Sequence, residues 1–421
     1  MIRIKTIPYK WELIVLLWLA FFFNQADRQV YNVVLPAIRD DLGLSDSSMG
    51  LVTTVLMIVS GFLVPVAGFA GDKFNKKYII IISMLVWSSA TLATGSSAIL
   101  LHLVLLRSVA TGGGEAFYFP SACALIGEYH ERTRATALSI HQTALYFGII
   151  CSGYLAGYIA DIYGWRMSFY VFGGCGIALA VLMSFRMKDS LIRHSRNIEG
   201  ESHAGITHVI KVFFKKPTAI LLTIAYSGMN FVGIGFLAWM PTFIHEKYNF
   251  SLSRAGFDAT FYHHIAAFIG VLIAARVADK LANKIIYVRG LVQTIGLFLG
   301  APFIYLMGKS DSLMVLYVAM AFFGLCRGIY ESNTWAALYD VIEMKYRAAA
   351  TGFVLTFGFL IGAFSPYILG LLKPVFGLSK GLSLLSLVYV FSALCILIAV
   401  LFFYKKDMIG SLKDIKTEYY D

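Results

Sequence analysis

The chain has 421 residues, of which 58% are hydrophobic and only 14% are charged. A soluble domain is nearer one quarter charged, so this composition excludes an ordinary soluble enzyme, a disordered chain and a disulfide scaffold. The net charge of +11 is basic enough to suggest a nucleic-acid partner. Most Lys and Arg residues, however, fall in alternate loops between apolar segments, where they set membrane topology instead.

Apolar stretches of helical length follow one another along nearly the whole chain. A spanning helix takes about 20 residues and each loop several more, so the length predicts about twelve spans in an all-α membrane protein. The expected spans, in chain order, are 12–37, 47–71, 78–98, 99–126, 135–161, 167–186, 217–244, 256–279, 285–307, 312–339, 347–372 and 379–404. The distribution of Lys and Arg predicts that both termini are cytoplasmic. The short linker and tails suggest a bacterial inner membrane.

A long polar interval divides the expected spans into two groups of six. We therefore expect an N-terminal six-helix bundle, a cytoplasmic linker, a C-terminal six-helix bundle and a cytoplasmic tail, at 1–186, 187–216, 217–404 and 405–421. The halves also repeat, since GFAGDKFNKK at 68–77 has the counterpart ARVADKLANK at 275–284. Matched halves about an axis normal to the membrane are a common transporter design, which predicts two pseudo-symmetric bundles.

Both loop segments resemble the loop signature of the major facilitator transporters and its second-half copy. Within that superfamily, three segments are similar to the anion:cation symporter family: Asn24-Gln-Ala-Asp27-Arg28, LPAIRDDLGLS at 35–45, and Gly114-Glu115-Ala followed by Pro120. Spinster-like lysolipid transporters share these segments. The resemblance covers the whole chain and implies a twelve-helix major facilitator fold that works by alternating access.

Asp27 and Arg28 lie in the middle of the first expected span. Ionisable side chains at that depth are costly unless they are paired or face water. Either the two form a structural pair that holds the span to its neighbours, or they are functional, with Asp27 as a protonatable carboxylate and Arg28 as a fork for an anion. Glu115 in the fourth span has no basic residue one turn away, which suits a proton carrier. The resemblance implies that Asp27 and Glu115 take protons and that Arg28 meets the substrate anion.

Arg107 departs from the pattern of the family that the chain resembles. That family places an arginine seven residues before this glutamate, whereas Arg107 lies eight residues before Glu115. Either the glycine run 112–114 absorbs the extra residue, or Arg107 has a different role. Three consecutive glycines weaken a helix, and we expect them to allow either a close approach between helices or a local bend.

Polar side chains in other spans are further binding candidates. Ser139, Gln142, Thr143 and Tyr146 share one helix face, which fits either a hydrated cavity or hydrogen bonds between helices; His141 is expected on the surface. Arg327 and Glu331 are four residues apart and either neutralise each other or contact substrate. The substrate-binding candidates are Arg28, Tyr31, Tyr118, Gln142, Tyr146, Asn230, Arg327, Glu331 and Asn333, and the His263–His264 pair is a further cavity candidate.

The two matched loops supply the gating candidates. These are Gly68, Asp72, Lys73 and Lys77 in the first half, and Asp279, Lys280 and Lys284 in the second. A carboxylate at one helix end can attract the N-terminus of a neighbouring helix, and breaking such contacts lets one half move against the other. A role in topology alone would explain the lysines but not the repeated aspartate.

The sequence contains no phosphate-binding loop, catalytic triad or zinc-ligand spacing, so we expect no enzyme, metal or cofactor, and no direct drive by ATP. We expect a proton-coupled symporter that imports a small organic anion such as a sugar acid (hexuronate, aldonate or sialic acid). The second interpretation is a Spinster-like proton-coupled exporter of lysolipids or other amphiphiles. The expected partners are the anion, protons and the lipid bilayer, with no nucleic acid, and the protein is expected to be a monomer.

Overall fold

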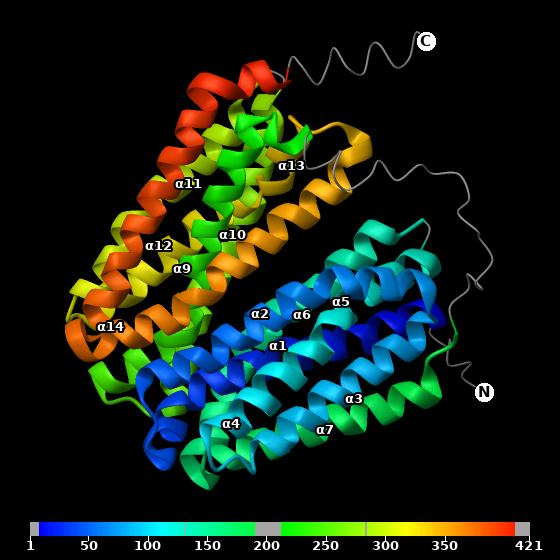
Figure 1. Cartoon of the computed structure of the whole chain (residues 1–421), viewed down its shortest axis with the longest axis vertical. Helices are drawn as coiled ribbons and strands as arrows, with labels where there is room; N and C mark the ends of the chain where they lie inside the picture. The colour runs from blue at the N-terminus through cyan, green and yellow to red at the C-terminus, as the bar shows by residue number, and fades with distance from the viewer. Residues whose placement is uncertain (1–7, 131, 190–211, 283, 409–421) are drawn as a thin grey trace, which may run out of the picture. The chain divides into compact units, whose positions relative to one another are not determined.

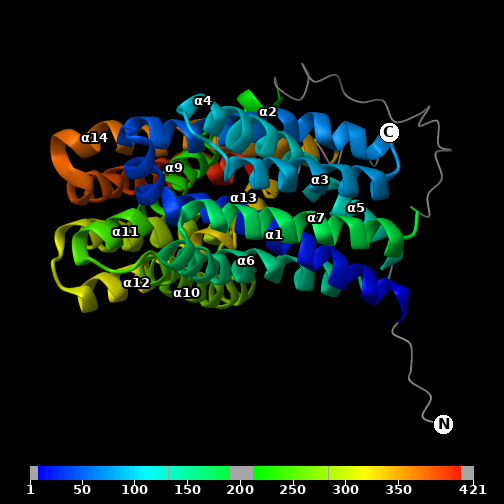
Figure 2. The ribbon, with the colours of Figure 1, turned by 90° about the horizontal axis from the view of Figure 1, so that it is seen from below.

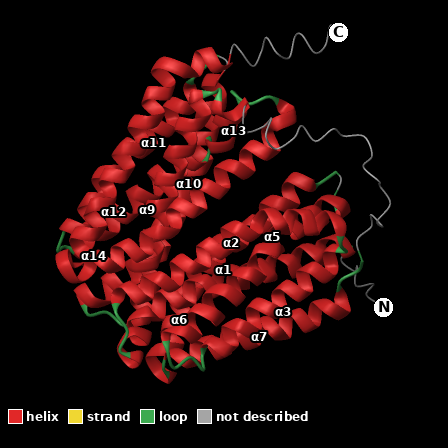
Figure 3. Cartoon of the chain, viewed as in Figure 1, coloured by secondary structure: helices red, strands yellow, loops and turns green. Residues whose placement is uncertain are grey.

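The structure is a computed structural model that describes residues 8–130, 132–189, 212–282 and 284–408. Throughout those ranges the chain is helical, with short connections and no strand (Figure 3). Contacts divide the chain into two compact units. The first contains Met1–Asn197 and Met240–Thr260, and the second contains Ile198–Trp239 and Phe261–Asp421. The all-helical fold agrees with the prediction, whereas most of the expected linker 187–216 and of the tail 405–421 lies outside the described residues.

The first unit is built on long helices that pack lengthwise. In chain order they are α1 (Tyr9–Leu42), α2 (Asp46–Lys73), α3 (Lys76–Thr94), α4 (Leu100–His102), the π-helix η1 (Leu103–Ala110), α5 (Thr111–Tyr129), α6 (Arg134–Tyr163) and α7 (Trp165–Arg186). α1 packs against α6, α5 against both α2 and α3, and α3 against α7 (Figures 1 and 2). The short α4, η1 and α5 follow one another without a break and form one helical rod.

The second unit contains most of the later helices. They are α9 (Pro217–Tyr248), α10 (Leu252–Ala282), α11 (Val288–Lys309), α12 (Leu313–Glu331), α13 (Thr334–Tyr339), the 3₁₀ turn η2 (Met344–Tyr346), α14 (Arg347–Ile398) and the π-turn η3 (Ala399–Phe403). The end of α9 and the start of α10 belong to the first unit. α11 packs against both α12 and α14. α14 is two helices joined at Gly377, whose φ of 76° is open to glycine but costly for other residues.

Helix boundaries follow local side-chain chemistry. Ser45 begins α2 by accepting a hydrogen bond from the Ser48 N–H at 3.2 Å, and Asn75 begins α3 by accepting one from the Lys77 N–H at 3.0 Å. Both contacts satisfy amide groups that the first helical turn leaves unpaired. α1 ends at Gly43, which adopts the left-handed conformation with φ of 60°.

Large apolar side chains cover the outer faces of the helices. Phe62, Phe185 and Phe402 are all exposed, with Phe185 at 83%, a pattern that is unfavourable in water but suited to lipid. Among the described residues, eight helical stretches are long and apolar enough to cross a membrane. They are Asp46–Leu63, Lys76–Thr94, Thr136–Tyr163, Trp165–Arg186, Pro217–Tyr248, Val288–Lys309, Leu313–Tyr339 and Ala349–Met408.

Candidate functional site

Four charged side chains meet inside the first unit. Asp27 and Arg28 lie in α1, Arg107 in η1 and Glu115 in α5. Asp27 is 1% exposed, and Arg107 and Glu115 are each 3% exposed. Burying an ionised group is expensive unless it is paired, so the partners of these four side chains decide what the site costs. We call these four residues the charged cluster.

Arg28 and Glu115 form an ion pair across helices. The Arg28 Nε donates to Glu115 Oε2 at 2.6 Å, and the Glu115 side chain is fully buried while that of Arg28 is 27% exposed. The second carboxylate oxygen, Oε1, finds no hydrogen-bond partner among the described residues. The guanidinium therefore neutralises Glu115 and remains within reach of solvent or ligand on its other side.

Arg107 is directed at the backbone of α1. Its Nη2 donates to the carbonyl oxygen of Asp27 at 2.9 Å and to that of Arg28 at 3.2 Å. Its guanidinium also lies over the Tyr31 ring, 5.6 Å from the centroid, where a cation is attracted by the π-face. Its Nε and Nη1 have no hydrogen-bond partner among the described residues. A buried cation with unused donors is a ready position for an anion or a water molecule.

The Asp27 carboxylate is the least satisfied member of the cluster. Neither of its oxygens has a hydrogen bond of good geometry in the described part of the chain. The Thr91 hydroxyl is a nearby donor, and the charged groups that act on the carboxylate are Glu115 and Arg107. Because a buried carboxylate without hydrogen bonds is costly in its charged form, a proton can reduce that cost. Asp27 is thus placed where proton binding and the charge of the cluster are linked.

The π-helix η1 resolves the unusual spacing of Arg107 and Glu115. Successive α-helical residues are about 100° apart, so a spacing of seven returns to nearly the same face whereas a spacing of eight is about 80° away. A π turn takes one residue more than an α turn, and η1 occupies Leu103–Ala110. The extra residue is therefore absorbed just before the glycine run, and both Arg107 and Glu115 reach α1.

The glycine run brings α5 close to its neighbours, as predicted. A Cβ on Gly114 would lie 2.9 Å from the backbone nitrogen of Trp87 in α3, and one on Gly112 would lie 3.0 Å from the carbonyl oxygen of Leu56 in α2. Either substitution would push helices apart. Close approach of these backbones is what lets the Glu115 side chain extend to α1.

A cavity of about 20 Å³ adjoins the cluster. Its walls include Arg28, Tyr31, Asn32, Thr53 and Arg107. A void of this size holds one water molecule, and the Thr53 hydroxyl is another buried group without a partner among the described residues. Polar groups, together with the apolar side chains of Val52, Leu56 and Met57, thus line a small space that a sugar-sized molecule would fill only after side chains move.

The remaining candidates of the first unit divide into core and surface. The Tyr31 hydroxyl donates to the Met49 carbonyl at 2.9 Å, and that of Tyr118 donates to the Leu17 carbonyl at 2.5 Å. Gln142 is exposed and Tyr146 half-buried on α6.

His141 was expected on the surface, but this prediction is wrong. Its ring is 1% exposed, stacks on Phe21 at 4.8 Å and lies 3.0 Å from the Tyr118 hydroxyl, because an aromatic pocket receives it.

In the second unit, Arg327 and Glu331 form the predicted pair within α12. Arg327 Nε donates to Glu331 Oε1 at 2.8 Å, so mutual neutralisation is confirmed, while a role in substrate binding stays a prediction. Asn230 donates to the Tyr226 carbonyl at 3.0 Å, and Asn333 donates to the Ser332 hydroxyl at 2.8 Å. These amides are thereby tied to their own helical turns.

The gating candidates are described only in part. At the end of α2, the structure does not describe the surroundings of Gly68 or the side chains of Asp72 and Lys73. Lys77 approaches Asp189, with 3.7 Å between Nζ and Oδ1, and Asp279 approaches Arg289 at 3.9 Å. Both separations are at the limit of an ion pair, and Lys280 and Lys284 are exposed. Their role as gates remains a prediction.

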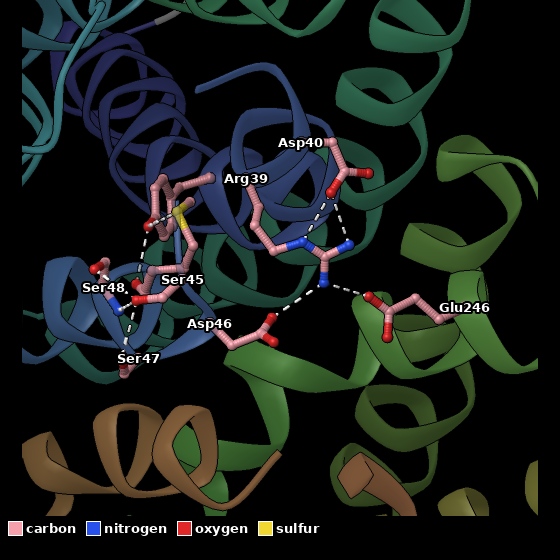
Figure 4. A network of polar contacts seen from close by, with 9 residues as sticks. Arg39, Asp40, Ser45, Asp46, Ser47, Ser48 and Glu246 are labelled. Carbon is pink, nitrogen blue, oxygen red and sulfur yellow. Dashed lines mark hydrogen bonds and ion pairs between the residues drawn. The ribbon is translucent and has the colours of Figure 1, made fainter. Parts of the chain in front are cut away.

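One polar network was not predicted as a contact. Figure 4 shows the Arg39 guanidinium at the end of α1 reaching Asp40, Asp46 at the start of α2, and Glu246 near the end of α9. The distances are 2.8, 3.0 and 2.6 Å. The charge run at 39–41 was visible in the sequence, but no spacing rule connects it to a carboxylate some two hundred residues later. Glu246 belongs to the first unit, so the network binds three helix ends of that unit together.

A second contact of this kind involves Asp161 at the end of α6. Its carboxylate accepts hydrogen bonds from the N–H groups of Leu252 and Ser253, each at 3.0 Å, and from the Ser253 hydroxyl at 2.7 Å. The acceptor therefore satisfies the first amides of α10, where the helix dipole favours negative charge. A contact of this kind, between a carboxylate and the N-terminus of a neighbouring helix, was expected for Asp72 and Asp279, and the structure shows it at Asp161.

Comparisons with known proteins agree with this architecture. The family model described as Major Facilitator Superfamily matches residues 17–366. The chain is 25% identical to the hexuronate transporter of Bacillus subtilis over 90% of this chain and 91% of the relative. It is 27% identical to protein spinster homolog 1 of Xenopus tropicalis, over 86% and 72% of the two chains.

A solved structure has the same fold. It is a bacterial homologue of the human lysosomal transporter Spinster in an inward-facing, unoccupied conformation, with a TM-score of 0.76, 20% identity, and coverage of 97% of this chain and 99% of that one. The family match takes in the whole charged cluster and both matched loops. The chain therefore belongs to the Major Facilitator Superfamily, and it is a multi-pass membrane transporter rather than an enzyme.

Proposed function

We propose that the protein is a proton-coupled symporter that imports a small organic anion, such as a hexuronate, an aldonate or sialic acid, by alternating access. The charged cluster is the observation that carries this proposal. It combines two buried carboxylates with two permanently charged guanidiniums, and intramembrane ionisable groups of this kind are functional by default.

Charge balance supplies the coupling. With Asp27 and Glu115 ionised, the cluster of two acids and two arginines is neutral overall. Protons on both carboxylates would leave the charges of Arg28 and Arg107 uncompensated in a low-dielectric interior, which an entering anion can neutralise. Release of the anion would favour release of the protons for the same reason. A proton can drive the cycle only through such differential affinity between states.

The substrate class is supported by the relative that is named a hexuronate transporter. A sugar acid has one carboxylate for a guanidinium, which binds it bidentately, and hydroxyl groups for the polar side chains on α6. The same cluster would also serve a Spinster-like proton-coupled exporter of lysolipids, and the Spinster relatives favour that second candidate. An amphiphile would need an apolar wall beside the arginines, whereas a sugar acid would not.

The membrane arrangement we propose has twelve spans, with both termini in the cytoplasm of a bacterial inner membrane. Counting α14 as two helices at Gly377, and treating α4, η1 and α5 as one rod and α12 with α13 as another, gives six helical rods before 187–216 and six after it. We propose that the transporter acts as a monomer, with the proton gradient as its energy source and without ATP or another cofactor.

Uptake into proteoliposomes under an inward proton gradient tests the proposal. Radiolabelled sugar acids and lysolipids would be compared in wild type, Asp27→Asn, Glu115→Gln and Arg28→Lys. Glu12→Gln is the matched control on the same helix, because Glu12 lies in the first turn of α1 and pairs with Arg186 at the end of α7. We expect gradient-driven accumulation of a sugar acid, lost in the three cluster variants and kept in the control. Movement of lysolipid alone would favour the exporter. Coupled uptake that persisted when Asp27→Asn and Glu115→Gln were combined would overturn the proton-coupling role.

A further inference from the structure

His263 is a buried imidazole in the second unit that none of the preceding roles uses. It lies midway along α10, is 1% exposed, and its Nε2 is 3.4 Å from Arg327 Nη1 in α12. A guanidinium has donors only and keeps its charge. The contact is therefore an N–H of Arg327 donating to an unprotonated Nε2, which requires the neutral imidazole with its proton on Nδ1.

Glycines in α12 create this contact. Gly324 and Gly328 flank Arg327 at four-residue spacing, and Cβ atoms there would overlap the backbone oxygens of His263 and Ala267, respectively. Two small residues four apart let helix backbones touch. The close approach brings the His263 ring to the side of α12 from which the Arg327 side chain emerges.

The other surroundings of the ring are apolar or aromatic. Phe236 of α9 and Phe323 of α12 lie with their centroids 4.8 and 4.7 Å from that of His263, and His264 lies at 5.0 Å. The Nδ1 has no hydrogen bond of good geometry among the described residues, and the backbone of Met320 in α12 is the polar group that acts on the ring from that helix. A phenylalanine would therefore fit this pocket at least as well as a histidine, so packing alone does not explain an imidazole here.

We propose that His263 is a positioning residue for Arg327. Its Nε2 holds one side of the guanidinium while Glu331, at 2.8 Å from Nε, holds another, so that the planar fork is fixed in one orientation for a substrate anion. The inference rests on the proposed function, in which Arg327 is a substrate-binding residue. A fixed fork loses less conformational entropy when it binds a carboxylate.

Two substitutions with opposite properties test it. His263→Phe keeps an aromatic ring among Phe236 and Phe323 but removes the acceptor, whereas His263→Gln keeps an acceptor at similar reach but loses the ring. A hydrogen bond to a charged group corresponds to about tenfold or more in affinity. We expect His263→Phe to raise the KM for the transported anion about tenfold with little change in Vmax. We expect His263→Gln to keep the KM within about threefold while lowering the Tm. If instead His263→Phe left the KM unchanged and His263→Gln raised it, the imidazole ring would contribute only packing.

A melting experiment separates this inference from the proposed function. The Tm shifts of His263→Phe, Arg327→Leu and the double variant in detergent depend on the contact and not on transport. We expect the shifts to be non-additive, since either substitution removes the same interaction. Additive shifts would overturn the inference. Non-additive shifts in a protein that transports no organic anion would instead overturn the proposed function, and with it the substrate role of Arg327.

Discussion

Replacing Arg28 by alanine leaves the Glu115 carboxylate buried without its partner. The Glu115 side chain is 0% exposed in the intact pair, and breaking a buried pair costs about 3–5 kcal/mol. The carboxylate can limit this cost by binding a proton. An ordinary glutamate titrates at about pH 4.3, and each pH unit above that value adds about 1.4 kcal/mol to the free energy of protonating it. Protonation therefore costs about 3.7 kcal/mol at pH 7 and about 1 kcal/mol at pH 5.

We therefore expect Arg28→Ala to lower the free energy of unfolding by about 3–4 kcal/mol at pH 7 and by only about 1 kcal/mol at pH 5. The sign follows because a protonated Glu115 leaves no unpaired charge in the interior, so acid reduces the cost of losing Arg28. Denaturant unfolding in detergent at the two pH values measures the difference. The matched control is Arg186→Ala, which removes an arginine that is 60% exposed from its pair with Glu12 and is expected to cost about 0–1 kcal/mol at both pH values.

A double variant tests whether the unpaired Glu115 charge causes this loss of stability. Arg28→Ala combined with Glu115→Gln removes both charges, and at pH 7 we expect it to be more stable than Arg28→Ala alone, because no unpaired carboxylate remains. An equal loss of stability at pH 7 and pH 5, or a double variant no more stable than the single one, would show that Glu115 is not a desolvated charge held by Arg28.

Three further outcomes follow from contacts outside the cluster. Asp161→Asn keeps the shape of the side chain but loses the charge that accepts from the first amides of α10, so we expect about 1 kcal/mol lower stability in a denaturant melt. Gly328→Ala places a methyl group against the Ala267 carbonyl and should cost about 1–3 kcal/mol in the same assay. Hydrogen bonds from Arg166 and Trp165 lower the pKa of Asp41. Its stabilising contribution is therefore present above the ordinary aspartate value and is lost as pH falls through the lowered folded value. In acid titrations followed by Trp fluorescence, Arg166→Gln should move the onset of unfolding to higher pH.

Each of these has a contradicting result. An Asp161→Asn variant as stable as wild type would mean that the amides of α10 need no charged acceptor. A neutral Gly328→Ala would mean that α10 and α12 have room between them. An acid transition unchanged by Arg166→Gln would show that Asp41 does not stabilise the fold through that arginine.

Much of the architecture was predictable because the membrane imposes simple constraints. Backbone groups in lipid have to be satisfied within helices, so apolar stretches of spanning length predict the helices directly. The expected break between 372 and 379 contains Gly377, where α14 changes direction. Asp27, Arg28 and Glu115 were also identifiable from sequence, since a charge in an apolar span is conspicuous whatever its partner.

The partners of those charges were not predictable from sequence. Arg28 could have paired with Asp27 beside it, but it pairs with Glu115 in α5 instead, and His141 lies in the core although it sits near a helix end. Both outcomes depend on how helix faces turn toward one another, and the close approaches of α5 to α2 and α3 at Gly112 and Gly114 are part of that packing.

The amino-acid sequence by itself determined that the chain forms apolar helices and that acids and arginines lie within them, and it predicted two matched halves, because hydropathy and charge act locally along the chain. The tertiary structure alone decided which charges meet. The spacing of Arg107 and Glu115 is resolved by the π-helix at Leu103–Ala110, and Arg39 pairs with Glu246, which lies 207 residues later in the chain. Such contacts arise from helix rotation and packing, whose energies are summed over many distant residues and are therefore not encoded in any one segment.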